Sequence, residues 1–212
     1  HHPSNALYAG DTLLHAEKSA CGEAVLDVIE LLTGSVTEQE ANLLYIAVTT
    51  DTGCFQYANT NAATLRAAAR LLELGADNRK ISMDFFRKIS RARMALVGQI
   101  YSGMRFFRGG QVAIAVVTRA LIDSVHATED DCDDIAGLPG RAEGAVVSVT
   151  IRELLDGRSK ISVRSNPEVD ACAICAVYGG GGHKMASGCT LDCGTETAVE
   201  KILAAIDQVW PA

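Results

Sequence analysis

Four consecutive glycines, Gly179–Gly182, are the feature that most limits how this chain can fold. Glycine loses more conformational freedom on folding than any other residue, so an ordered run of four is costly. Such a run is expected where something lies directly on the backbone, and a phosphate or another anion held by backbone N–H groups is the common case. His183 and Lys184 follow at once and add donors of positive character. We therefore predict an anion-binding cradle in Tyr178–Gly188; a flexible surface loop is the alternative, but linkers pair glycine with serine.

Composition limits which anions the cradle can serve. The chain has 212 residues, enough for one domain or two small ones, with 48% hydrophobic and 21% charged residues as in ordinary globular proteins. A net charge of −7 argues against a basic surface that coats long nucleic acid. Aromatic residues make up only 5%, which argues against a stacking platform for many bases. A small anion, or one bridged to carboxylates by metal cations, stays compatible.

The sequence also predicts a cytoplasmic location without a membrane partner. No apolar run approaches the ~20 residues that a membrane span needs, and the first residues lack the pattern of a signal peptide. The seven cysteines are odd in number and lie in apolar surroundings. Reduced thiols of the cytosol fit this usage better than a disulfide framework.

A second candidate site is Asp51. A capping box, Thr37 with Glu40, opens the apolar helix Ala41–Val48, and the chain then runs into Thr49-Thr50-Asp51-Thr52-Gly53. A carboxylate at the end of an apolar element is costly unless it is paired, and a metal ion is one partner that would offset the cost. The alternative is an aspartate that only caps the next turn. The local pattern leaves both open.

The chain begins with His1 and His2, in HHPSN. A purification-tag remnant is one interpretation of this start. Adjacent histidines are also good ligands for divalent metals or contacts for phosphate when carboxylates lie near.

Helical periodicity and capping residues predict several further helices. They are a helix with Ser19 as N-cap and Gly34 at its end, Ala62–Leu74 after Thr60-Asn61, Asp77–Phe86, Ser90–Tyr101, Arg119–Ala127, Val169–Val177, and Ala198–Trp210 opened by a capping box of Thr197 and Glu200.

Two hairpins are predicted in the second half of the chain. Met104–Arg108 and Gln111–Thr118 flank a Gly-Gly turn, and Ala145–Ile151 and Ser159–Arg164 flank Asp156-Gly157. The change from helix-rich to hairpin-rich sequence places a domain boundary near residues 95–103, which gives domains 1–95 and 96–212.

Two other clusters resemble metal sites only superficially. The acidic stretch Glu129–Asp134 lacks the ligand spacing and central glycine of a calcium loop. Cys172 with Cys175, and Cys189 with Cys193, resemble a four-cysteine zinc site, but the first pair lies in an apolar helical pattern. Cysteine in such a pattern is usually a small core residue.

Three motifs, in order along nearly the whole chain, resemble those of the DHH-family phosphoesterases and in particular their nanoRNase group. HHPSN (1–5) is similar to the end of the family's Asp-His-His motif, without its Asp. TDTGCFQYANT (50–60) is similar to the motif that carries a metal-binding Asp, and VRSNPEVDACAICAVYGGGGHKMASG (163–188) to the DHH-associated C-terminal domain.

The resemblance implies an α/β fold in two lobes. The first would be the C-terminal part of a parallel-sheet DHH domain, whose N-terminal half is absent from this sequence. The second would be a smaller mixed-sheet α/β domain that binds substrate. Most of the family's metal ligands belong to the absent half, so the chain by itself is expected to be nearly inactive.

The implied activity is that of a hydrolase. It would degrade short oligoribonucleotides to mononucleotides and dephosphorylate 3′-phosphoadenosine 5′-phosphate, with water activated by two divalent ions, manganese first and magnesium or cobalt as alternatives. The alternatives are a cyclic-dinucleotide phosphodiesterase and a noncatalytic nucleotide- or RNA-binding module. Expected partners are short RNA and nucleoside bisphosphate, but neither a membrane nor long duplex nucleic acid; a homodimer is compatible.

The resemblance also implies the site residues. His1 and Asp51 would be metal ligands, and His2 would be the catalytic residue beside the scissile phosphate. The substrate would be held by Arg164, Ser165, Gly180, Gly181, Gly182 and His183.

Overall fold

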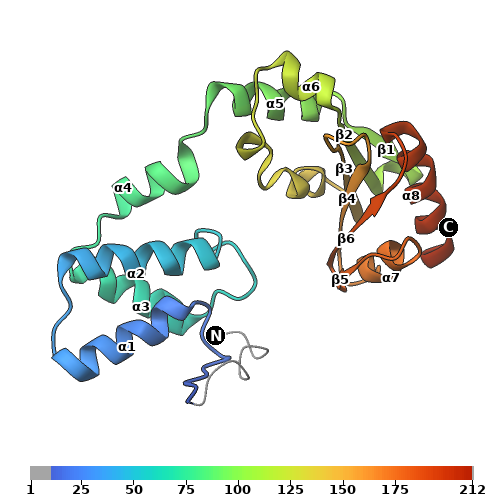
Figure 1. Cartoon of the computed structure of the whole chain (residues 1–212). Coiled ribbons are helices and arrows are strands. Elements are labelled where there is room, and N and C mark those ends of the chain that lie inside the picture. Colours follow the sequence, from blue (N-terminus) through green and yellow to red (C-terminus); the bar gives the residue numbers. More distant parts are fainter. Residues whose placement is uncertain (1–10, 212) are drawn as a thin grey trace. The chain divides into compact units, whose positions relative to one another are not determined.

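The computed structural model describes residues 11–211, and these fall into two compact units that divide between Ile89 and Ser90 (Figure 1). The sequence predicted this boundary a few residues later, after residue 95. The helix α5, Arg91–Ser102, lies in the second unit because its Leu96 and Ile100 are buried against Ala115 and Val117 of that unit. Ser90 caps this helix, so the second unit begins at its N-cap.

The described part of the first unit is helical. Its elements are α1 (Cys21–Thr33), α2 (Glu38–Asp51), α3 (Ala62–Glu73) and α4 (Asn78–Ser82), which continues into a π-helical turn, Met83–Arg87. Leu26, Leu44, Val48 and Leu71 form the centre of its core. Burying such a side chain stabilises the fold by roughly 1.5–3 kcal/mol.

Local capping signals were correct at several of these helix ends. The Thr37 hydroxyl accepts the N–H of Glu40, whose carboxylate accepts the N–H of Thr37 at 2.8 Å. Asn61 caps α3, and Gly34 ends α1 in the left-handed conformation. The prediction of Ser19 as an N-cap was wrong, because the cap is Ala20. Tertiary contacts occupy the Ser19 hydroxyl, which donates to the Asn59 carbonyl and contacts the hydroxyl of Thr64.

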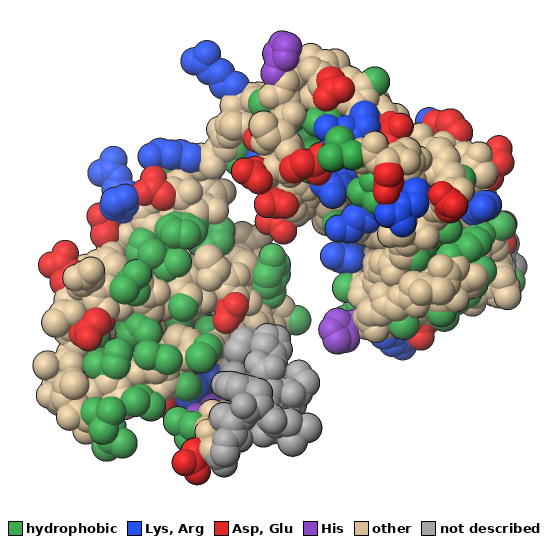
Figure 2. All heavy atoms as spheres, in the orientation of Figure 1, with side chains coloured by type: hydrophobic (Ala, Val, Ile, Leu, Met, Phe, Trp, Pro, Cys, Tyr) green, Lys and Arg blue, Asp and Glu red, His purple; other side chains and the backbone are tan. Residues whose placement is uncertain are grey.

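The surface of the first unit is unusually apolar. Hydrophobic side chains gather on the face of α1, α2 and α3 that Figure 2 shows. Leu31, Leu32, Leu43 and Leu65 are each more than half exposed. Contiguous apolar surface of this kind marks a surface that contacts something else.

The second unit is built on one mixed sheet of six strands. The strands are β1 (Arg105–Phe107), β2 (Val112–Val117), β3 (Val147–Glu153), β4 (Ser159–Ser165), β5 (Gly181–His183) and β6 (Ala186–Leu191), in the order β1-β2-β3-β4-β6-β5. Only the β2–β3 pair is parallel, and both predicted hairpins are present. The strand β6 was not anticipated, since its sequence ASGCTL has little strand propensity.

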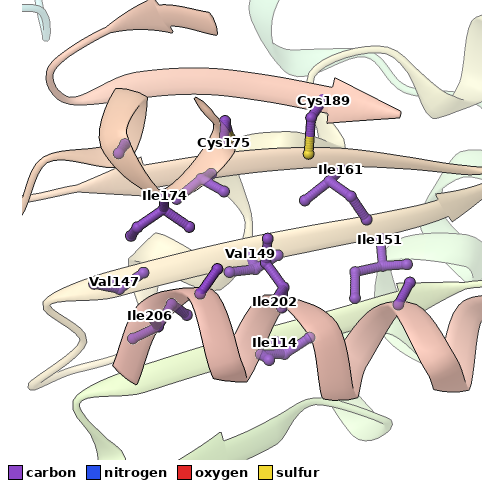
Figure 3. Packing of buried hydrophobic residues seen from close by; sticks show 14 of the residues in the cluster. Ile114, Val147, Val149, Ile151, Ile161, Ile174, Cys175, Cys189, Ile202 and Ile206 are labelled. Carbon is purple, nitrogen blue, oxygen red and sulfur yellow. The ribbon is translucent and has the colours of Figure 1, made fainter. Parts of the chain in front are cut away.

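One face of the sheet carries the main core. Ile114, Val149 and Ile161 pack against the helices α7 (Ala171–Ala176) and α8 (Thr195–Val209), as Figure 3 shows with Ile174 and Ile202 from those helices. The closing helix begins earlier than predicted. Gly194 is its N-cap and its carbonyl accepts the first helical bond from the Ala198 N–H, so the capping box at Thr197 was wrong.

The other face of the sheet is covered only in part. The helices α5 and α6 (Arg119–Ser124) and the 3-10 turns of the β2–β3 crossover form a small core over β2 with Ala115 and Val117. The turns span Asp130–Cys132, Ile135–Gly137 and Pro139–Arg141. This half-covered face, at β4, β6 and β5, is where the candidate substrate site lies.

No helix in residues 11–211 has the length and apolar character to cross a membrane. All seven cysteines lie in this described range, and none forms a disulfide.

Candidate functional sites

Asp51 is the last residue of α2, and its side chain is exposed. A carboxylate at a helix C-terminus faces the negative end of the helix dipole, which costs roughly 0.3–1 kcal/mol. The side-chain amide of Asn59 donates to the Asp51 carbonyl oxygen at 3.1 Å. The backbone at Asp51 is thereby tied to the end of the loop that follows.

That loop has a strained backbone. Gly53, Cys54 and Phe55 have φ values of 55°, 55° and 64°, in the left-handed region that residues with side chains rarely adopt. The buried Thr52 hydroxyl donates to the Val48 carbonyl at 2.7 Å and accepts the Phe55 N–H at 3.1 Å, which holds the turn. A Cβ atom on Gly53 would lie 2.4 Å from the ring of the exposed Tyr57, so a side chain at this position would displace that ring. Strain of this kind is retained at functional sites and points to this loop as one.

Asp51 fits as one ligand of a hard divalent cation. Carboxylate oxygen is the ligand type that magnesium and manganese prefer, and a cation would offset the unfavourable helix dipole. Within residues 11–211 no three His, Cys, Asp or Glu side chains gather as a metal site. The other two residues assigned to the reacting centre, His1 and His2, lie outside the described residues.

In the second unit the register of the strands brings Arg164 and His183 onto one face of the sheet. Arg164 of β4 lies opposite Ala186 of β6, and Ala186 lies opposite His183 of β5. Directly opposite residues share a face, and neighbouring strands are about 4.8 Å apart, so two strand spacings separate the two residues by about 10 Å. Only the small side chain of Ala186 lies between them.

The same face continues along the strands as two further rows. Ser162 lies beside Gly188 and Gly181, and Lys160 lies beside Thr190. We call the residues of these three rows the polar face: Lys160, Ser162, Arg164, Gly181, His183, Ala186, Gly188 and Thr190. Its centre is small and its edges carry donors, which leaves room for a ligand to approach the backbone of β6.

Arg164 has charge available for a ligand. Its guanidinium donates to the Val163 carbonyl oxygen at 3.0 Å. No carboxylate in the described part of the chain forms an ion pair with it. A half-buried guanidinium with free donors is suited to bidentate contact with a phosphate.

Ser165 is not brought together with Arg164. Strand alternation places it on the opposite face, and its hydroxyl donates to the Val169 carbonyl at 2.7 Å. Its described role is therefore to hold the turn that leads into α7.

The glycines of the run have different roles. A Cβ on Gly180 would lie 2.3 Å from the Gly188 carbonyl and 2.4 Å from the Cβ of Cys189, and one on Gly182 would lie 2.6 Å from the Ala186 carbonyl. These two positions are glycine because the backbone of β6 passes so close. Gly181 has open space around it and belongs to the polar face. The run thus leads into a short edge strand rather than a free loop. Its close approach to β6 is a reason for the glycines that the sequence did not reveal.

The cysteines next to the run are core residues. Cys175 of α7 and Cys189 of β6 are buried members of the core that Figure 3 shows. A hydrogen bond between the two thiols lowers the pKa of Cys175 and raises that of Cys189, where burial acts in the same direction. The burial of Cys175 in the main core confirms the interpretation of this residue as a small core residue.

We predict that His183→Ala weakens nucleotide binding without disturbing the fold, because the His183 side chain is exposed on the polar face. The loss of one hydrogen bond to a charged group corresponds to an affinity about 10-fold lower or more. Titration with adenosine 3′,5′-bisphosphate measures the affinity. The control is His126→Ala, because His126 is an exposed turn residue outside the polar face. Unchanged affinity would remove His183 from the site.

Comparisons with known proteins give a domain family, several relatives and a similar solved structure. Residues 109–210 match the DHHA1 domain. The chain is 36% identical over 208 residues to the bifunctional oligoribonuclease and PAP phosphatase NrnA of Thermus thermophilus, covering 97% of this chain and 62% of that protein. It is 30% identical over 189 residues to the protein of the same name from Mycoplasma genitalium, covering 89% of this chain and 58% of that protein.

A solved structure is also similar. The exopolyphosphatase-related protein from Bacteroides fragilis aligns with a TM-score of 0.88 and 25% identity, over 98% of this chain and 62% of that one. The second unit is thus a DHHA1 domain, and the chain belongs to the DHH family. Within that family it belongs to the nanoRNase group, and it spans about three fifths of the length of these relatives.

Proposed function

We propose that the protein containing this chain is a metal-dependent phosphoesterase. It degrades short oligoribonucleotides to mononucleotides and dephosphorylates 3′-phosphoadenosine 5′-phosphate, the two activities for which its relatives are named. The observation that carries the proposal is the placement of Arg164 and His183 in one row of the polar face, about 10 Å apart across the small Ala186. That spacing suits one phosphate held from both sides.

Each residue then has a distinct role. Arg164 binds the substrate phosphate with two parallel N–H donors, and His183 donates to the same phosphate or to the adjoining sugar. Gly181, Ala186 and Gly188 have little or no side chain and leave the ligand room at the backbone. The strand β5 lies at the edge of the sheet and leaves outward-facing backbone groups available for hydrogen bonds, whereas the Gly180 N–H already donates to the Cys175 carbonyl at 3.0 Å.

Asp51 and His1 would hold the divalent ions, manganese first and magnesium or cobalt as alternatives. When bound, these ions supply a water of lowered pKa as the attacking group and stabilise charge on the phosphate. A ring nitrogen of His2 would hold the proton that is exchanged with the phosphate oxygen. The strained turn after Asp51 and the hydrogen bond from Asn59 hold the backbone that carries this carboxylate.

The proposal extends to location and partners. Seven thiols without a disulfide in the described range fit the reducing cytoplasm. Short RNA and nucleoside bisphosphate are the proposed ligands, and a homodimer is the proposed assembly that size-exclusion chromatography would test.

The test is hydrolysis by the longest natural protein that contains this chain. We expect release of mononucleotides from a diribonucleotide, and of phosphate from adenosine 3′,5′-bisphosphate, with manganese present and none after chelation. Cleavage of a cyclic dinucleotide with neither of these activities would contradict the proposal. Tight binding of short RNA without any turnover would instead make the chain part of a noncatalytic module.

A further inference from the structure

A cavity of about 150 Å³ opens on the sheet face that carries Arg164. Its floor is formed by Thr150 and Arg152 of β3 and by Lys160 and Ser162 of β4. Its roof is the segment 132–136 of the β2–β3 crossover, which brings in two adjacent aspartates. Thr150 donates weakly to the carbonyl oxygens of the roof at 3.4 and 3.5 Å, so the segment lies directly over this face.

The cavity lies at a defined distance from the phosphate site. Ser162 is two residues from Arg164 on the same face of β4, which is about 7 Å along the strand, and Lys160 is about 13 Å away. A phosphate held by Arg164 would therefore have its own sugar and base, rather than the next phosphate alone, within reach of the cavity.

The charges around the cavity favour an uncharged part of a ligand over a phosphate. Two cations, Arg152 and Lys160, face two carboxylates, Asp133 and Asp134. The charge of Arg152 is further engaged by Glu129, at 3.1 Å. A phosphate inside would meet both carboxylates, whereas Arg164 in the neighbouring row has no carboxylate partner among the described ion pairs. Along β4, a phosphate is therefore favoured at Arg164 and an uncharged part of the ligand is favoured in the cavity.

The polar groups of the cavity can accept and donate at the same time. The Ser162 hydroxyl makes no hydrogen bond within the described structure, and neither do the carboxylates of Asp133 and Asp134, which are exposed. Carboxylates accept hydrogen bonds from a sugar hydroxyl, and Lys160 and Ser162 can donate to sugar or base oxygens and nitrogens.

We propose that this cavity holds the ribose of the nucleotide whose phosphate binds Arg164, with Asp133 and Asp134 placed to accept a hydrogen bond from its 2′-hydroxyl. The cavity would then select ribonucleotides over deoxyribonucleotides, because the 2′-hydroxyl is the group by which proteins distinguish the two. This inference rests on the proposed function, since it needs the phosphate on Arg164.

Two probes that differ only at the 2′ position test it: adenosine 3′,5′-bisphosphate and 2′-deoxyadenosine 3′,5′-bisphosphate. Binding to the full chain is measured by calorimetry with chelator present, so that no turnover occurs. We expect the ribonucleotide to bind about 10-fold more tightly or better, the size of one lost hydrogen bond to a charged group. In the double variant Asp133→Asn with Asp134→Asn the preference should shrink to about 3-fold or less, because amides are weaker acceptors than carboxylates.

Matched controls separate the inference from simple loss of charge or fold. The double variant Asp123→Asn with Asp130→Asn removes the same charge from neighbouring positions outside the cavity and should keep the preference. Asp134 has φ of 58°, a conformation that asparagine adopts as readily, so the roof should persist in the variant. Arg164→Ala should weaken both probes equally.

Equal binding of the two probes by the unchanged chain, or an unchanged preference in the Asp133 and Asp134 variant, would overturn the inference. Failure to bind either probe would overturn it as well. The hydrolysis assay decides the proposed function separately: turnover without a 2′ preference removes only the cavity assignment, and a preference without turnover removes only the catalytic one.

Discussion

Asp51→Asn should abolish turnover while leaving the fold intact. Asparagine keeps the size of the side chain but loses the charge that binds a divalent ion. A metal centre contributes several kcal/mol to the transition state, and each ~1.4 kcal/mol is tenfold in rate, so we expect kcat/KM to fall by about a thousandfold or more. The measurement is manganese-dependent hydrolysis of a diribonucleotide, together with the manganese dissociation constant from calorimetry.

The matched control is Asp27→Asn, which removes the same charge from the same unit. Asp27 pairs with Lys18 on the exposed surface of α1, an interaction of little energetic weight. Activity should stay near that of the unchanged protein, and both variants should unfold within a few degrees of it. Retained turnover or unchanged manganese affinity in Asp51→Asn would remove Asp51 from the metal centre.

Gly180→Ala should strongly destabilise the second unit. The new methyl group would lie 2.3 Å from the Gly188 carbonyl and 2.4 Å from the Cβ of Cys189, and backbone cannot move aside as a flexible side chain can. Overpacking of this kind costs about 1–3 kcal/mol and sometimes more. Urea unfolding followed by the fluorescence of Trp210, the single tryptophan, reports on this unit because the ring packs against its core.

Gly181→Ala is the control for the same substitution one position along the chain. Its Cβ would meet nothing within 4 Å, and its φ is outside the left-handed region, so the urea midpoint should barely move. The two variants should therefore differ clearly in urea midpoint, while the dependence of the unfolding free energy on urea concentration stays the same. Equal midpoints would contradict the account of the glycine run as a close strand contact.

The features that could be predicted from the sequence are those with a local cause. The capping box of Thr37 and Glu40, the terminating Gly34 and the Asp156-Gly157 turn each act within a few residues, and each was identified correctly. Ser19 and Thr197 carry the same local signals, but tertiary contacts and an earlier helix start overrode them. Local chemistry decides a helix end only where nothing distant competes.

The candidate site depended on register, which the sequence analysis did not resolve. The alternation of Lys160, Ser162 and Arg164 is typical of a strand with one polar face, but the sequence prediction extended only to a strand at Ser159–Arg164. Nothing local shows that His183 joins this face through β6, since that follows from pairings between separate segments. The acidic stretch Glu129–Asp134 carries no local signal that the crossover folds Asp133 and Asp134 over the sheet.

The crossover between β2 and β3 contains both residues that the core constrains and exposed residues that it does not. Three apolar side chains of the crossover are buried in the small core and are therefore constrained by the fold: Cys132, Ile135 and Leu138. The residues between them face solvent and the cavity, so they can vary without cost to the sheet. New sugar or base preferences, in evolution or in a laboratory library, would therefore arise by substitution at the exposed positions of this segment, while the strands of the polar face stay unchanged.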